Sequence, residues 1–239
     1  MPSLPIPDFR FATARALLAA LFAAVVATLV VVPGRPSLAG SVVPDAVVRA
    51  EVLPGWTTKE GTRMAALRLI LAPGWKTYWR APGDAGIPPL FNWSGSRNLH
   101  SVTLHWPRPR VFMTNGLRTI GYADELVLPM EFRPADAGSP IALVGEVELG
   151  VCESVCVPAT LKFSATLEGR GRSDPKIHAA LADRPVSASR AGVGTVTCSF
   201  SPISDGLLLT AQIQMPRIGK NVVVLVETAD PAVWVAQPE

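Results

Sequence analysis

The sequence predicts an all-β protein, with an immunoglobulin-like β-sandwich followed by a partial second β-domain. Two observations favour this class. Apolar and polar residues alternate with the period of a β-strand in many short segments, and no long helical period follows the N-terminus. The 23 prolines and 19 glycines interrupt these segments often, as expected for short strands joined by turns. Seven or more such strands within about 120 residues are typical of a sandwich.

The first 39 residues have the features of a targeting segment. Arg10 and Arg15 precede an apolar run from Ala16 to Val32. Small residues in Ser37-Leu38-Ala39 match a signal-peptidase site, with cleavage directly after Ala39. The run is long for a signal core and near the lower limit for a membrane span, so an uncleaved anchor is the alternative. Either outcome exports the remaining chain to a compartment where disulfides persist.

Charge and length limit the partners and the number of domains. The chain has 239 residues, which suits one large domain or two small ones. Its formal net charge of +3 falls to about +1 once residues 1–39 are set aside, and no basic stripe remains. The sequence therefore predicts no nucleic-acid partner.

Residues 45–168 contain the strands of the predicted sandwich. Each predicted strand is an alternating apolar segment that ends near a proline or a glycine. Glycines and prolines also predict a loop at Arg80–Pro89. The predicted strands include Leu67–Leu71, Trp75–Trp79, Val102–Trp106, Leu126–Phe132, Ile141–Val151 and Leu161–Leu167.

Residues 169–194 interrupt the strands and are predicted to form a linker with a short helix. Ser173-Asp174-Pro175 supplies a capping side chain and a proline for the first turn of this helix, which would end near Asp183. Alternation resumes in residues 195–239, which we interpret as a partial second β-domain. Its predicted strands are Val196–Phe200, Leu207–Ile213 and Val222–Val226.

Two cysteines four residues apart, Cys152 and Cys156, follow directly after the Ile141–Val151 strand. Apolar residues occupy the odd positions of that strand, and successive side chains of a strand point to opposite faces. Cys152 therefore falls on the same face as Glu146 and Glu148, away from the core. A thiol on a solvated face would be accessible to another protein.

The spacing of Cys152 and Cys156 favours a redox-active pair. Extended chain would separate their α-carbons by roughly 13 Å, whereas a disulfide needs about 4.4–6.8 Å, so the chain must turn tightly between them. Closing so small a loop stabilises little, roughly 2 kcal/mol against about 3 kcal/mol for fifteen residues. Local pairs are commoner among disulfides that are made and broken. A structural clip and half of a metal site are the alternatives.

No metal site or other cofactor is predicted. Zinc needs four ligands, and no second Cys/His pair occurs at ligand spacing. The third cysteine, Cys198, shares an apolar face with Val196 and Phe200, so we predict an inert core thiol, with a resolving role as the alternative.

The residues between the paired cysteines are Glu153, Ser154 and Val155. A neighbouring carboxylate disfavours a thiolate, so Glu153 is expected to raise the thiol pKa. The sequence thus predicts a slow thiol rather than a strong oxidant.

Several motifs together resemble a known family. They are Gly74-Trp75-Lys76-Thr77-Tyr78-Trp79, Pro82–Pro88, Ile120-Gly121-Tyr122 with Leu126–Pro129, and Gly150-Val151-Cys152 with Cys156-Val157-Pro158. Over residues 45–168 the chain resembles the periplasmic N-terminal domain of the thiol:disulfide interchange protein DsbD, in its stand-alone bacterial version.

This resemblance implies a function and the residues that perform it. Cys152 and Cys156 would be the catalytic pair of a protein-disulfide reductase component in the periplasm, with possible anchoring in the inner membrane. The pair would take electrons from a membrane-embedded donor of DsbD type and pass them to periplasmic thioredoxin-like proteins. Those partners serve disulfide isomerisation, cytochrome c maturation or copper tolerance. The resemblance also implies a loop aromatic that shields the pair, and we place Phe112 there, with ordinary packing as the alternative.

Two other functions stay open at this point. The first is a non-catalytic β-sandwich binding module in which Cys152–Cys156 is a permanent clip. The second is copper handling, which predicts stabilisation of the fold by Cu(I).

Overall fold

The computed structural model describes residues 47–239 except 84, 115, 218, 220–221, 229–232, 234, 237 and 239. The signal peptide or anchor predicted in residues 1–39 lies outside the described residues. None of the helices in the described part has both the length and the apolar character that crossing a bilayer requires.

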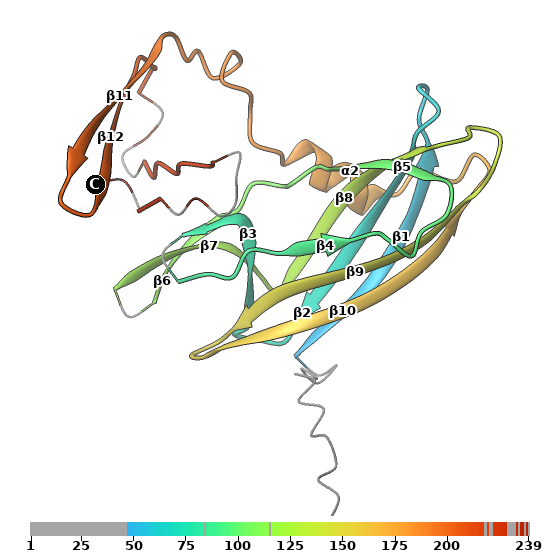
Figure 1. Cartoon of the computed structure of the whole chain (residues 1–239). Coiled ribbons are helices and arrows are strands. Elements are labelled where there is room, and N and C mark those ends of the chain that lie inside the picture. Colours follow the sequence, from blue (N-terminus) through green and yellow to red (C-terminus); the bar gives the residue numbers. More distant parts are fainter. Residues whose placement is uncertain are drawn as a thin grey trace, which may run out of the picture. The chain divides into compact units, whose positions relative to one another are not determined.

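The described chain is nearly all β and contains two antiparallel sheets that face each other as a sandwich, which confirms the predicted class (Figure 1). One sheet has four strands in the order β1-β2-β8-β5. Its strands are β1 (Val48–Thr57), β2 (Arg63–Leu71), β5 (Leu99–Leu104) and β8 (Glu125–Pro134).

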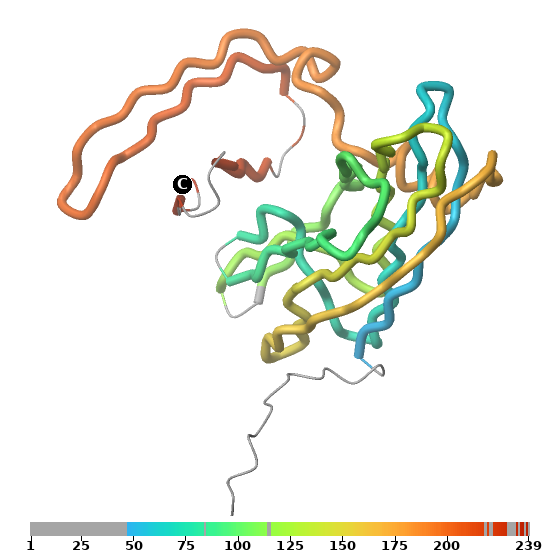
Figure 2. Tube along the Cα trace, turned by 45° about the vertical axis from the view of Figure 1, so that its right-hand side comes forward, coloured from blue at the N-terminus to red at the C-terminus, as the bar shows by residue number. Residues whose placement is uncertain are grey.

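The second sheet has six strands and carries the cysteines. Its order is β10-β9-β3-β7-β6, and β4 pairs with β9. Figure 2 traces the long antiparallel pair β9 and β10 along one edge. The strands are β3 (Lys76–Gly83), β4 (Leu90–Asn92), β6 (Arg110–Thr114), β7 (Leu117–Ala123), β9 (Ile141–Cys152) and β10 (Cys156–Leu167).

Alternation along β9 places the core between the two sheets. Ile141, Leu143 and Val147, at odd positions, are buried, whereas Val144 and Glu148, at even positions, are exposed. One face of the strand therefore packs into the sandwich and the other faces outward. The strand predicted over Ile141–Val151 is confirmed on this pattern.

The predicted loop at Arg80–Pro89 is shorter than expected. Strand β3 continues to Gly83, so only the second half of that segment forms a loop. The glycines and prolines marked the break correctly, but pairing of Gly83 with Thr119 of β7 extends the strand into it.

Helix α2 (Pro175–Ala182) begins where the capping residues predict. The Asp174 carboxylate accepts hydrogen bonds from the backbone N–H groups of Lys176 and Ile177, at 2.8 and 3.2 Å. Pro175 occupies the first turn, where its missing N–H leaves no donor unsatisfied.

The helix predicted within the linker packs on the sandwich. Ile177 is fully buried against Met64 and Ala66 on the outer face of β2. On the opposite face of the same strand, Ala65 and Leu67 belong to the core between the sheets. This helix explains why the first half of β2 is buried on both sides.

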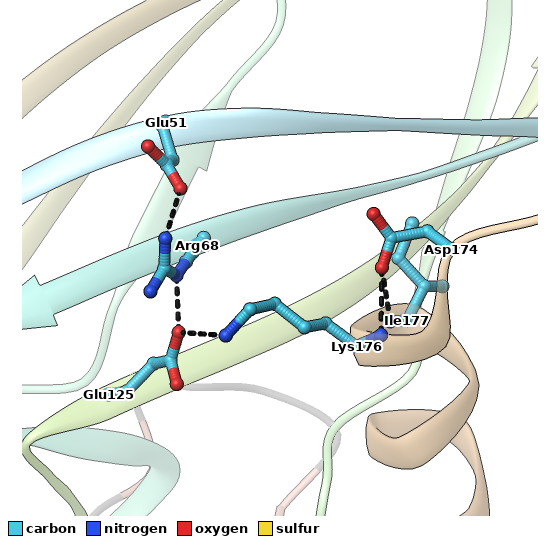
Figure 3. Close-up of polar contacts among 6 residues, drawn as sticks. All are labelled: Glu51, Arg68, Glu125, Asp174, Lys176 and Ile177. Atoms are coloured by element: carbon cyan, nitrogen blue, oxygen red, sulfur yellow. Dashed lines mark hydrogen bonds and ion pairs between the residues drawn. The ribbon is translucent and has the colours of Figure 1, made fainter.

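A chain of ion pairs accompanies this contact (Figure 3). Lys176 Nζ lies 3.1 Å from Glu125 Oε1, the same oxygen pairs with Arg68, and Arg68 Nη1 lies 2.6 Å from Glu51 Oε1. Burial alone would raise the pKa of Glu125, but the hydrogen bonds from Arg68 and Lys176 outweigh it and lower that pKa. Because these groups are largely solvated, the buried Ile177 contributes more to holding the helix than the ion pairs do.

Strands β11 (Val196–Ile203) and β12 (Gly206–Ile213) form a separate two-stranded sheet. Register places Val196, Cys198 and Phe200 on one face of it. Cys198 is exposed, so the prediction of a buried core thiol is wrong. Alternation identified the apolar face, but a lone hairpin has no second layer to cover it.

Residues 222–226, predicted as a strand, adopt no strand in the structure. Val223 and Leu225 are partly buried against the sandwich core. Glu227 follows them and accepts two hydrogen bonds from the Arg80 guanidinium, at 2.6 and 3.0 Å. This apolar segment thus packs against the sandwich core instead of forming a strand.

Candidate functional site

Cys152 and Cys156 form a disulfide at the tip of the β9–β10 hairpin. Cys152 ends β9, Cys156 begins β10, and the two are direct partners in the ladder with α-carbons 4.1 Å apart. Glu153–Val155 form the reversal between the strands. In both Figure 1 and Figure 2 this tip and the β6–β7 hairpin lie toward the same end of the sandwich.

The two cysteines differ in exposure. Cys152 is only 3% exposed, whereas Cys156 is exposed. The alternation of β9 ends at Gly150, because Gly150, Val151 and Cys152 are all buried. The prediction that Cys152 is solvated is therefore wrong. Its side chain lies on the face away from the core, but that face is covered.

The β3–β4 loop covers this face. A Cβ atom built on Gly150 would lie 2.8 Å from Ile87 Cβ, so Ile87 sits directly over Gly150. A Cβ atom on Gly86 would lie 2.8 Å from Tyr78 Cδ1, so the loop also packs on the Tyr78 ring. The approach of loop to sheet depends on glycine at both positions.

Tyr78 contacts both sulfurs. Its hydroxyl donates a hydrogen bond to Cys152 Sγ at 2.8 Å, and its oxygen lies 3.2 Å from Cys156 Sγ. The neighbouring Thr77 hydroxyl donates to the Gly150 carbonyl at 2.9 Å and holds β3 against β9. The motif that contains Tyr78 predicts no role for this residue, because only the pairing of β3 with β9 brings Tyr78 to the cysteines.

Lys76 and Phe112 adjoin this arrangement. Lys76 is the direct partner of Cys152 in the β3–β9 ladder. Its Nζ lies 5.4 Å from the centre of the Phe112 ring, and the Arg110 guanidinium carbon lies 5.4 Å from the same ring. Phe112 is half-buried on β6. Its ring therefore contacts β3, the strand that pairs with β9 at Cys152.

Neither tyrosine of the native protein is expected to titrate near its ordinary pKa of about 10. Tyr78 and Tyr122 are the two tyrosines of the chain, and burial raises the pKa of both. The folded state disfavours tyrosinate, so the contribution of the two tyrosines to the free energy of unfolding is constant below about pH 10 and falls as pH rises above it. Tyrosinate absorbance against pH measures this, with the urea-unfolded chain as control. Coincident native and unfolded titrations would contradict it.

The chemistry that these side chains offer is the making and breaking of a disulfide. Thiol–disulfide exchange needs a sulfur within reach of a partner, and Cys156 meets this condition. A hydrogen-bond donor at the second sulfur stabilises the charge that develops there when the bond breaks. Within the described part of the chain, no three His, Cys, Asp or Glu side chains gather as candidate metal ligands.

A comparison with known families identifies the family of this chain. A family model, the N-terminal domain of the thiol:disulfide interchange protein DsbD, matches residues 46–168. The N-terminal periplasmic domain of ScsB from Proteus mirabilis is similar, with 24% identity and a TM-score of 0.48, over 74% of this chain and 83% of that one. The reduced N-terminal domain of Neisseria meningitidis DsbD gives 20% identity and a TM-score of 0.29, over 50% of this chain and 86% of that one.

A search among curated proteins found no match. The family model nevertheless covers more than half of the 239 residues and includes both paired cysteines. Family and local disulfide together support thiol–disulfide exchange as the chemistry of the site. The chain belongs to the family of the N-terminal domain of the thiol:disulfide interchange protein DsbD.

Proposed function

We propose that this protein carries electrons in the periplasm by opening and closing its Cys152–Cys156 disulfide. It would accept them from a membrane-embedded reductase of DsbD type and pass them to thioredoxin-like partners. The observation that carries the proposal is a local disulfide in which one cysteine, Cys156, is exposed and lies beside the hydroxyl of Tyr78. A bond that closes so small a loop adds little to stability, which favours a redox role over a structural one.

The exposure of Cys156 and the burial of Cys152 determine which sulfur is attacked first. A thiolate of the reduced donor attacks Cys156 Sγ, the bond to Cys152 breaks, and Cys152 leaves as a thiolate that then takes a proton. The second thiol of the donor attacks the resulting mixed disulfide and frees Cys156. The donor is then a disulfide, and this protein has gained two electrons and two protons. With an oxidised thioredoxin-like partner, the same steps run in reverse.

Equilibration with glutathione or dithiothreitol tests the redox role. The protein should carry Cys198→Ser, because Cys198 is exposed and would react by itself. We expect a potential in the range of known carriers, about −120 to −270 mV. A bond that resists reduction well below about −300 mV would overturn the proposal.

A disulfide that resists reduction well below about −300 mV would favour a non-catalytic binding module with a structural clip. The burial of Cys152 is the observation that favours this alternative, since a covered sulfur exchanges slowly. The two functions thus differ in one measurable quantity, the potential of a single bond.

We further propose that Phe112 restricts access to the cysteine pair until a partner docks. Its support is the position of the ring beside Lys76, the cross-strand partner of Cys152. Ordinary edge packing of a half-buried aromatic is the alternative.

Replacement of Phe112 by alanine is expected to speed reduction of the disulfide by dithiothreitol several-fold, because a smaller side chain leaves the sulfurs more accessible. The rate is measured by quenching with acid and counting free thiols. Phe200→Ala, at an exposed position of β11, is the matched control and should leave the rate unchanged. Equal rates in all three proteins would leave Phe112 with a packing role alone.

A further inference from the structure

We propose that Lys76 is the electrostatic partner of the Cys152 sulfur, whose thiolate it stabilises each time the disulfide opens. The inference rests on the exchange function proposed above and adds a residue from outside the cysteine turn to it. Between the cysteines the sequence supplies one charged residue, the acidic Glu153. The fold adds a cation from a strand more than seventy residues away in sequence.

Register places Lys76 opposite the reacting bond. Lys76 pairs with Cys152, and Thr77 pairs with Val151, in an antiparallel ladder. Side chains of directly opposed residues leave the same face with Cβ atoms about 4.5–5.5 Å apart. Tyr78, two residues along the same strand, shares this face, and its hydroxyl does reach Cys152 Sγ at 2.8 Å. The flexible four-carbon stem of Lys76 gives its ammonium group a similar reach.

Burial makes such a cation necessary. Cys152 is 3% exposed, and an unpaired charge is disfavoured at so buried a position. When the disulfide breaks, the bonding electron pair stays on Cys152 Sγ while Cys156 bonds to the attacking sulfur. The Tyr78 hydroxyl offers this anion one hydrogen bond. An ammonium group adds the opposite charge that one neutral donor lacks.

Among the residues that the structure describes, the other charged and titratable groups around the bond do not replace Lys76. Glu153, on the turn, opposes a thiolate by its own charge. Tyr78 stays neutral, because burial raises its pKa. Arg110, on β6, lies 5.4 Å from the centre of the Phe112 ring, and no contact of Arg110 with the sulfurs is seen among the described residues.

Phe112 gives the Lys76 ammonium a position in the oxidised protein. The disulfide carries no charge, and the ammonium then lies 5.4 Å from the ring centre. An exposed cation–π contact is weak compared with an ion pair to a desolvated anion. Of these two contacts, the ion pair to the Cys152 thiolate is the stronger for the Lys76 ammonium group.

The test compares Lys76→Met, Lys76→Arg and Lys162→Met in a Cys198→Ser background. Lys162 lies in the same sheet, on β10, paired with Glu146 at 3.4 Å and six ladder positions from the disulfide, so it controls for loss of one positive charge. At low ionic strength Lys76→Met should slow reduction by dithiothreitol about threefold. This is the effect of raising the pKa of the leaving Cys152 thiol by about one unit, with a Brønsted coefficient near 0.5. Lys76→Arg should restore the rate, and Lys162→Met should match the parent.

Thiolate absorbance gives a second readout that does not need any exchange partner. With Cys156→Ala added, Cys152 is the remaining thiol, and its titration midpoint should rise by about one pH unit in Lys76→Met. Added salt should reduce the difference in titration midpoint between Lys76→Met and its parent, because salt screens the charge of the ammonium group. Lys76→Gln, which keeps a polar side chain, serves the same comparison if the methionine variant does not fold.

The outcomes distinguish a failure of the proposed role of Lys76 from a failure of the proposed exchange function. If Lys76→Met and Lys162→Met give the same midpoint and the same rate, the inference is overturned. If the parent disulfide cannot be reduced at all, the exchange function fails, while the thiolate titration still decides whether Lys76 acts on Cys152.

Discussion

Cys152→Ser is expected to accumulate a mixed disulfide with a partner, and Cys156→Ser is expected to accumulate about tenfold less or none. In the first variant the exposed Cys156 thiol attacks an oxidised partner, and no second thiol remains to resolve the product. In the second the remaining thiol is 3% exposed beneath Tyr78 and the β3–β4 loop. Access therefore separates two cysteines that the sequence alone treats as equivalent.

The measurement is a non-reducing gel of full-length variants incubated in periplasmic extract, with the adducts identified by mass spectrometry. Every variant should carry Cys198→Ser, since an exposed third thiol forms adducts of its own. The variant lacking both Cys152 and Cys156 is the blank. Equal yields from the two single variants would show that Cys152 is accessible in solution, and no adduct from either would remove the support for electron transfer to partners.

Local pattern predicted much of the sandwich because its strands are amphipathic. Strands β8 and β9 were found from alternation, since each has one face in the core and one outward. The start of helix α2 was found from Asp174 and Pro175, whose effects act within one turn. Such signals depend on neighbours in the sequence and do not need the tertiary fold.

Burial depended on segments that are distant in sequence. Alternation gave the correct face to Cys152, but the loop that covers that face carries Ile87 and comes from the β3–β4 connection. Cys198 shows the opposite error, because its apolar face meets no second layer among the described residues. A strand pattern tells which side chains share a face and not what lies above them.

The same limit applied to the chemistry of the site. Cys152 and Cys156 were identifiable because their spacing is local. Lys76 and Tyr78 act on them only through the pairing of β3 with β9, which a single sequence does not show. The prediction of a slow thiol rests on Glu153 alone, whereas the fold adds the Tyr78 hydroxyl at the Cys152 sulfur and places Lys76 opposite Cys152 in the ladder.

The largest loss of stability is expected for Phe132→Ala. Phe132 is fully buried on β8, and its ring meets the edge of Trp93 at 5.8 Å between centroids. Trp93 in turn contacts Phe163 of the other sheet at 5.7 Å and stacks on Phe91 at 5.5 Å. Truncating Phe132 removes one member of a cluster that joins the two sheets and leaves a cavity. The expected loss is about 3–5 kcal/mol of unfolding free energy.

Urea unfolding followed by circular dichroism measures this loss, with the same substitution at Phe200 as control. Phe200 is 66% exposed, so its truncation should change the free energy by about 0.5 kcal/mol or less. A loss of about 3–5 kcal/mol is a large part of the roughly 5–15 kcal/mol that holds a typical domain, and the variant should unfold at a much lower urea concentration. Equal losses at the two positions would mean that the aromatic cluster does not join the sheets. Contacts other than this cluster would then stabilise the sandwich in which β3 pairs with β9 at the cysteines.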